Sequence, residues 1–151
     1  MTLSDADLAA QPAAYWTGVA YESLIAFTRA RQAEFGFSQP QFWLLRHLSV
    51  NDLSPDGQGR SIPALREAMA EYLRAEDDLA AEAETLLGRG WLRLDEDGLW
   101  WLTEEGEAAR VRFQGHAPEI RARIHDGVDD ADYLVALKVL RRMIENTGGA
   151  G

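Results

Sequence analysis

The sequence predicts a mainly α-helical protein with one short β-hairpin set between its helices. Along most of the chain, apolar residues recur at every third or fourth position, which is the period of one helical face. An Asp-Gly step between two short apolar runs is a hairpin signal. At 151 residues, 46% of them hydrophobic and 26% charged, the chain can bury one core. We therefore expect a single domain over residues 1–151.

The first long helix is expected over residues 12–34. Its apolar face is made by Trp16, Val19, Ala20, Leu24, Phe27 and Ala30. Gly36 ends this helix. A second helix is expected from Gln39 to Leu48, because Ser38 and Gln41 have the spacing of a capping box and Pro40 fits a first helical turn.

Residues 51–60 combine Pro, Gly, Asp and Asn and are expected to form an exposed loop. Ser61 can then cap a third helix that runs to about Tyr72. Its inward residues are expected to be Ile62, Leu65 and Met69.

A fourth helix is expected from about Glu76 to Gly88. Its spacing places Leu79, Ala83 and Leu86 on one face and leaves the acidic residues outside, among them Asp77, Asp78, Glu82 and Glu84. The runs 91–94 and 99–102 flank the Asp97-Gly98 turn, so they should pair as a β-hairpin.

Thr103 and Gly106 open a fifth helix, whose apolar positions are Phe113, Ala117, Ile120 and Ile124. Pro118 is expected to kink or split it, since proline lacks the N–H that the helix needs. Asp129 or Asp130 caps a sixth helix, with an apolar stripe of Tyr133, Leu137, Leu140 and Ile144.

Three helices followed by a hairpin is the element order of a winged helix-turn-helix, and here long helices precede and follow it. This arrangement resembles the multiple antibiotic resistance regulator (MarR) family over residues 37–110. Residues 37–48 are similar to the family's second helix, residues 61–73 to its third, and residues 86–92 to the end of the recognition helix and the first wing strand. Residues 102–106 (LTEEG) are similar to the family's Leu-Thr-x-x-Gly step.

The resemblance implies a transcriptional regulator that binds double-stranded DNA at a pseudo-palindromic operator as a homodimer. The winged helix-turn-helix would span residues 38–106, and residues 12–34 and 107–146 would be dimerisation helices. The DNA contacts are expected from Arg60, Ser61, Arg74, Thr85, Arg89 and Arg93. Apolar stripes on terminal helices also favour a dimer. The alternative is that these stripes only cover the chain's own core.

Charge favours a second hypothesis. The net charge is −10, and residues 61–106 contain twelve acidic and four basic residues. Helix four offers few donors to base edges. The arginine of the family's wing is missing, because Asp97 is followed by Gly98 and Leu99. The alternative function is therefore an acidic winged-helix dimer that no longer reads DNA and binds a protein, such as a basic or nucleic-acid-binding one.

Aromatic residues gather in the sequence around the first two helices, where the resemblance implies a cleft for aromatic ligands in some members. The candidate residues for a small aromatic effector are Tyr15, Trp16, Phe42, Trp43 and His47. The alternative for the same residues is an ordinary aromatic core.

Other function classes find no support in the sequence. Without cysteine there is no disulfide or thiolate metal site. His47, His116 and His125 lack a second ligand at helical spacing, so no metal site is expected. No catalytic motif is present, and we expect neither an enzyme nor a cofactor. Without a signal peptide or an apolar run of roughly 20 residues, a cytoplasmic protein is expected.

Overall fold

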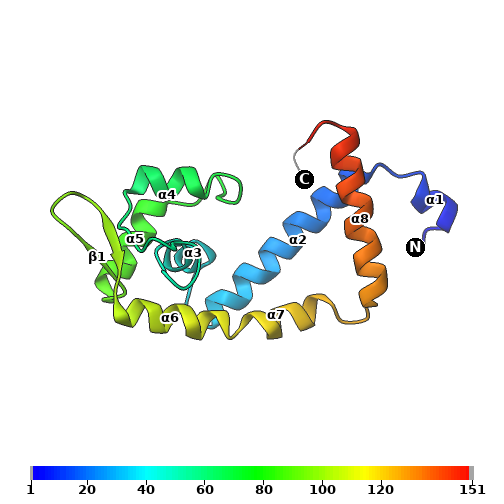
Figure 1. Ribbon diagram of the computed structural model, residues 1–151. Coiled ribbons are helices and arrows are strands. Elements are labelled where there is room, and N and C mark those ends of the chain that lie inside the picture. Colours follow the sequence, from blue (N-terminus) through cyan, green and yellow to red (C-terminus); the bar gives the residue numbers. More distant parts are fainter. Residues whose placement is uncertain (1, 150–151) are drawn as a thin grey trace. The chain divides into compact units, whose positions relative to one another are not determined.

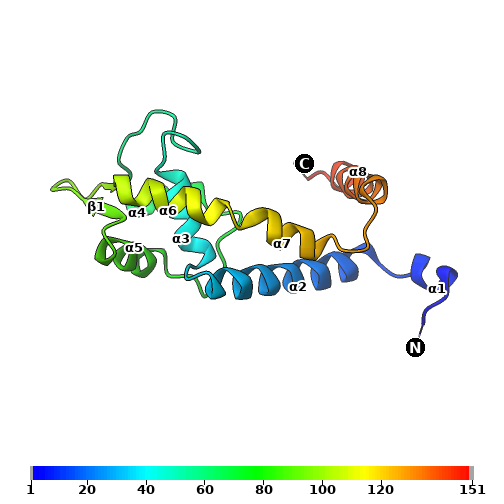
Figure 2. The same ribbon diagram turned by 90° about the horizontal axis from the view of Figure 1, so that it is seen from below.

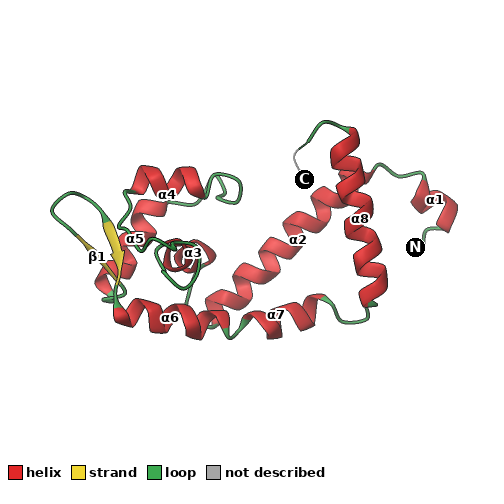
Figure 3. Ribbon diagram, in the orientation of Figure 1, coloured by secondary structure: helices red, strands yellow, loops and turns green. Residues whose placement is uncertain are grey.

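The computed structural model describes residues 2–149 and is mainly helical with one antiparallel hairpin, which confirms the predicted fold class (Figure 1, Figure 3). By contacts, the chain divides into two compact units, Met1–Ala117 and Pro118–Gly151. The elements of the first unit are α1 (Asp5–Ala9), α2 (Ala13–Glu34), α3 (Gln39–His47), α4 (Ile62–Ala68), α5 (Leu79–Gly88), β1 (Leu92–Leu94), β2 (Trp100–Leu102) and α6 (Glu104–Gln114). Then follow α7 (Ala117–Ile124), which starts at the boundary, and α8 (Asp130–Asn146).

Helix caps were predicted well because they depend on local hydrogen bonds. Both bonds of the expected capping box at α3 are present, between Ser38 and Gln41. The Ser61 hydroxyl accepts from the backbone N–H of Ala64 at 3.2 Å and begins α4. Asp129 caps α8. Each cap satisfies an N–H that the helix leaves open.

Helix lengths depart from the sequence expectation in three places. α4 ends at Ala68 rather than near Tyr72, and the Tyr72 ring packs at 4.5 Å on Trp43 of α3. α5 begins at Leu79 rather than near Glu76, because Asp78 is its N-cap. The short α1, capped by Ser4, was not predicted.

The fifth expected helix is two helices, as the proline predicted. α6 ends at Gln114 and α7 begins at Ala117, so Pro118 lies in the first turn of α7. There its missing N–H disrupts no intrahelical hydrogen bond.

One core joins α3 to α6 at the C-terminal end of α2 (Figure 1). α3 packs against both α5 and α6. The buried cluster, which we call the winged-helix core, comprises Phe37, Leu44, Leu45, Leu48, Leu65, Met69, Leu79, Ala83, Leu86, Leu92, Trp100, Ala109 and Phe113. It includes the inward residues expected of the third and fourth helices, except Ile62, which packs against it half-buried.

The wing is short, and hydrogen bonds within it hold its turn. Its strands pair Leu92 with Leu102 and Leu94 with Trp100. The Asp95 carboxylate accepts from the backbone N–H groups of Asp97 and Leu99, both at 2.9 Å, and from the Trp101 indole at 2.8 Å. These bonds lower the pKa of Asp95, the indole bond most. The wing tip is therefore a rigid turn with an ionised carboxylate inside it.

The Leu-Thr-x-x-Gly step has a physical reason. Thr103 caps α6 through the N–H of Gly106, and its hydroxyl donates to the carbonyl of Gly90 at 2.7 Å. A Cβ added at Gly106 would lie 2.0 Å from the carbonyl oxygen of Trp91. Only glycine lets α6 start this close to the wing strand.

Two helices keep much of their apolar surface exposed within one chain. α2 exposes Tyr15, Trp16, Val19, Tyr21 and Leu24 on the part that extends away from the winged-helix core (Figure 2). α8 has no buried residue and exposes Leu134, Val135, Leu137, Val139, Met143 and Ile144. Between residues 2 and 149, no helix has the length and apolarity that crossing a bilayer requires.

Candidate nucleic-acid interface

α5 stands where a recognition helix is expected, with one face buried and the other open. Leu79, Ala83 and Leu86 are fully buried in the winged-helix core. The opposite face exposes Asp78, Ala81, Glu84, Thr85 and Gly88. We call these five residues the outer face of α5. It carries two carboxylates and no basic side chain.

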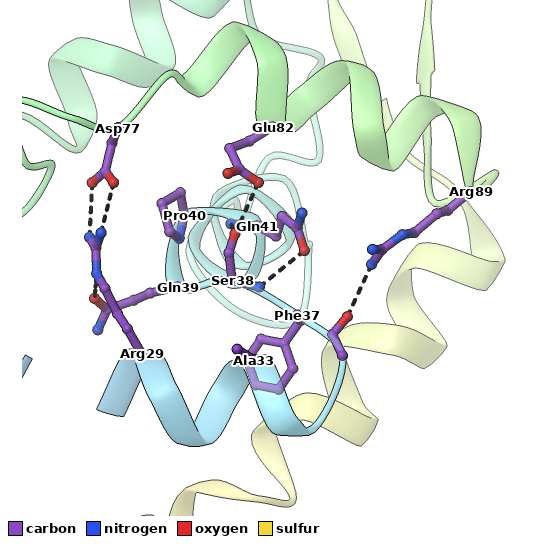
Figure 4. Close-up of a pocket in the computed structure, with 11 residues that line it drawn as sticks. Arg29, Ala33, Phe37, Ser38, Gln39, Pro40, Gln41, Asp77, Glu82 and Arg89 are labelled. Atoms are coloured by element: carbon purple, nitrogen blue, oxygen red, sulfur yellow. Dashed lines mark hydrogen bonds and ion pairs between the residues drawn. The ribbon is translucent and has the colours of Figure 1, made fainter. Parts of the chain in front are cut away.

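Asp77 does not belong to this outer face, contrary to the sequence expectation. Both its carboxylate oxygens accept from the Arg29 guanidinium, at 2.7 and 2.8 Å, and its side chain is only 6% exposed (Figure 4). It also accepts from the backbone N–H of Arg74 at 2.8 Å. The Arg29 bonds hold the pKa of Asp77 below its usual range. This pair ties α2 to the start of α5.

Glu82 was also expected to point outward and is instead half-buried. Its carboxylate accepts from the Ser38 hydroxyl at 3.0 Å (Figure 4). The expected outward acidic set is thus wrong for two residues, because their partners, the Arg29 guanidinium on α2 and the Ser38 hydroxyl at the start of α3, are distant in sequence.

The arginines expected to contact DNA have partners within the chain. Arg74 pairs with Glu22 at 2.8 Å and Glu76 at 2.9 Å, which raises its pKa. Arg60 lies 3.6 Å from Asp56. The Arg89 guanidinium donates to the Gly36 carbonyl, and that of Arg93 stacks on the Trp101 ring at 4.9 Å.

The two hydroxyls proposed for DNA contact are also engaged. Ser61 is the N-cap of α4, and Thr85 donates to the carbonyl of Ala81 at 3.2 Å. A hydroxyl that donates inward still keeps an acceptor, but phosphates need donors. In this geometry Thr85 has no donor left, whereas the Ser61 hydroxyl accepts in its cap and keeps its O–H donor.

Arg66 was not among the expected DNA contacts. It is exposed on α4 and, across residues 2–149, makes no hydrogen bond or ion pair. The helical spacing that places Leu65 and Met69 inward also turns Arg66 outward, so this signal was present in the sequence.

The five residues proposed for an aromatic ligand lie in two separate places. Tyr15 and Trp16 pack edge-to-face at 5.3 Å near the start of α2. The α3 residues Phe42, Trp43 and His47 lie beyond its other end. The Arg29 guanidinium of α2 lies 5.9 Å from the centre of the Trp43 ring, and at 1.5 Å per residue the helix rises roughly 20 Å from Trp16 to Arg29. One chain does not bring them together.

The α3 group forms part of a half-buried aromatic cluster. Trp43 packs at 4.5 Å on Tyr72, whose hydroxyl hydrogen-bonds His47. Burial, more than the nearby arginines, lowers the pKa of His47, so the ring is neutral at physiological pH.

An ion-pair network lies between α3 and α6. Arg110, buried on α6, donates to Glu107 at 2.6 and 3.0 Å and to Asp52 at 3.3 Å. Glu107 also accepts from Ser49 and Asn51, at 2.7 and 3.0 Å. The bond from Arg110 lowers the pKa of Glu107 most, to about 2. This network fixes the start of the 51–60 loop to α6.

Within residues 2–149, no three His, Asp or Glu side chains gather as a metal site would require.

Comparisons with known proteins concern the fold. No family model matches the sequence, and the curated proteins give no match. Among solved structures, BpsR of Bordetella bronchiseptica, described for regulation of its DNA binding by 6-hydroxynicotinic acid, is 21% identical with a TM-score of 0.63, covering 89% of this chain and 95% of its own. Reduced MarR from E. coli is 13% identical, with a TM-score of 0.65 and coverage of 89% and 94%.

A Mycobacterium tuberculosis MarR family protein in complex with DNA is 19% identical, with a TM-score of 0.63, and covers 92% of this chain and 99% of its own. Likenesses at such low identity establish fold. The chain thus has the MarR-type winged-helix fold that the sequence resemblance implied.

Proposed function

We propose that this protein is a MarR-like transcriptional regulator, a homodimer that binds a pseudo-palindromic operator in double-stranded DNA. The observation that carries the proposal is the MarR-type fold along nearly the whole chain, with α5 exposed on one face. Asp77 and Glu82 turn toward α2 and α3, which removes two of four carboxylates from the surface a groove would meet. Similar structures include one in complex with DNA.

The dimer is supported by the exposed apolar residues of α2 and α8. Monomeric soluble proteins rarely expose contiguous apolar patches of this kind. Six large apolar side chains of α8 are 39–58% exposed within one chain. A second copy is the occupant that fits, because isologous contacts between terminal helices would cover both stripes at once.

A small aromatic effector remains part of the proposal. Phe42, Trp43 and His47 make a half-buried aromatic surface on α3. The expected effect of such a ligand is a change in DNA affinity.

A DNA-binding titration tests the proposal that the protein binds an operator. Wild-type protein is titrated at low salt against DNA from upstream of its own gene and against random fragments of equal length. We expect preference for the upstream DNA and a shallow dependence of affinity on salt, because few phosphates can be neutralised. Binding to neither DNA would overturn the operator proposal.

A protein partner is the second candidate function, and the charge geometry favours it. The outer face of α5 bears Asp78 and Glu84, while Arg60 and Arg74 are paired with carboxylates. A basic protein surface would be attracted to this face and phosphates repelled from it. Sequence-preferring DNA binding by the wild type would refute this alternative.

A further inference from the structure

A cavity of about 440 Å³ lies between the end of α2, the start of α3 and α5 (Figure 4). Its volume falls within the range of small-molecule sites, about 300–1,000 Å³. The lining residues are Arg29, Ala33, Gly36, Phe37, Ser38, Gln39, Pro40, Gln41, Asp77, Glu82 and Arg89. None of the residues proposed for an aromatic effector lines it, so this is a separate site.

Arg29, Gln39 and Asp77 line one part of the cavity. There the Arg29 and Asp77 side chains bind each other through two hydrogen bonds, and Gln39 accepts a third from Arg29 at 2.9 Å. Their charges are already satisfied. This part forms a wall rather than a binding group.

Charged groups with unused capacity lie along the remainder of the cavity. Arg89 has five N–H donors, of which one meets the Gly36 carbonyl at 3.2 Å. Glu82 accepts one hydrogen bond, from Ser38. Across residues 2–149, Arg89 has no carboxylate partner and the second oxygen of Glu82 has no donor.

Both charged side chains are bound to one short segment of chain, residues 36–38. Arg89 is bound to residue 36 and Glu82 to residue 38, and two residues of chain span at most about 7 Å. They nevertheless form no ion pair with each other within the described chain. A ligand with opposite charges at its two ends can satisfy both.

The floor of the cavity includes apolar residues. Phe37 is 4% exposed and stacks on Phe113 with ring centroids 4.0 Å apart. Ala33 and Pro40 line the same cavity. A flat hydrocarbon body would lie against this floor.

We propose that this cavity binds a small zwitterion, with its carboxylate at Arg89, its ammonium at Glu82 and its apolar body against Phe37. The site goes beyond the proposed function, and DNA plays no part in its test. If Arg89 serves this cavity, it is not available as a DNA contact.

Calorimetric titration of the full-length protein with 4-(aminomethyl)benzoate tests the proposal. This probe carries a carboxylate and an ammonium at opposite ends of one ring, and benzoate and benzylamine each carry one of the two groups. We expect saturable binding of the zwitterion and weaker binding of either single-charge compound. Absence of saturable zwitterion binding, or equal affinity for benzoate, would overturn the proposal.

Two variants that each remove one charge test whether Arg89 and Glu82 bind the zwitterion. Arg89→Gln and Glu82→Gln should each weaken zwitterion binding about tenfold or more, because each removes one charged hydrogen-bond partner. Arg66→Gln is the matched control, an exposed arginine on α4 outside the cavity, and should bind like the wild type. Circular dichroism checks that each variant is folded. Unchanged affinity in folded Arg89→Gln would refute the assignment, and so would an equal loss in Arg66→Gln.

Discussion

The winged-helix core buries its apolar side chains, whereas α8 leaves its apolar side chains exposed. The core buries thirteen apolar residues, which come from the four helices α3 to α6 with their caps, from both wing strands and from the loop at Phe37. α8, with a strongly two-sided sequence, buries none within its own chain. The first region is complete in one chain, and the second leaves its apolar side chains exposed in one chain. The buried side chains that stabilise the fold and the exposed apolar side chains available for assembly therefore lie in different parts of this sequence.

The largest expected effect tests the completeness of the core. Gly106→Ala should destabilise the fold by about 3 kcal/mol or more, because its Cβ would meet the Trp91 carbonyl oxygen at 2.0 Å and backbone would have to move. Urea denaturation followed by circular dichroism measures it. Gly88→Ala is the control, since a Cβ there meets nothing within 4 Å, and it should stabilise slightly or have no effect. Equal behaviour of the two variants would contradict the close approach.

The next effect addresses α8. Leu137→Glu should abolish the proposed dimer, because a charge buried in an apolar interface without a partner costs several kcal/mol. Sedimentation velocity at micromolar concentration measures the dimer. Leu53→Glu is matched to it, since Leu53 is 43% exposed and Leu137 40%. A monomeric wild type, or a dimer that survives Leu137→Glu, would show that α8 is not the interface.

Glu107→Gln should lower the free energy of unfolding by about 2 kcal/mol, because the buried Arg110 side chain loses its closest charged partner. The folded pKa of Glu107 is about 2, below its unfolded value. Its contribution is therefore complete above roughly pH 5 and is lost as the pH falls toward 2. Unfolding free energies measured between pH 7 and 3 should fall less steeply in Glu107→Gln than in wild type. Parallel curves would mean that the pair adds no stability.

The smallest expected effect is a difference in stability between variants of two neighbouring carboxylates at the start of α5. Asp77→Asn should destabilise by about 1–2 kcal/mol, because it breaks the bidentate pair with Arg29. Asp78→Asn should have little effect, since asparagine caps a helix as well as aspartate does. The same denaturation measurement compares them. A larger loss in Asp78→Asn would reverse the assigned roles.

Local chemistry explains how much of the fold could be predicted. The caps at Ser38, Ser61 and Asp129, the Asp-Gly hairpin and the break near Pro118 all depend on neighbours within a few residues. The buried face of α5 followed from helical spacing alone. These features were confirmed because the interactions that create them are short in sequence.

The candidate site was harder to predict because its partners are distant in sequence. Asp77 lies 48 residues from Arg29, and Glu82 lies 44 residues from Ser38. Helical spacing placed both carboxylates outward, whereas the Arg29 guanidinium binds Asp77 and the Ser38 hydroxyl binds Glu82. The proposed DNA contacts and the proposed aromatic ligand residues stay predictions.

By itself, the sequence determined the order of helices and hairpin, the caps, the residues of the core and the acidic character of the chain, since each depends on composition or on local periodicity. Only the tertiary structure decided which carboxylates remain on the outer face of α5, which arginines are paired and where a cavity opens. The physical reason is that a carboxylate takes the orientation in which it meets its hydrogen-bond donors, and only folding brings donors that are distant in sequence, such as Arg29 and Ser38, near Asp77 and Glu82.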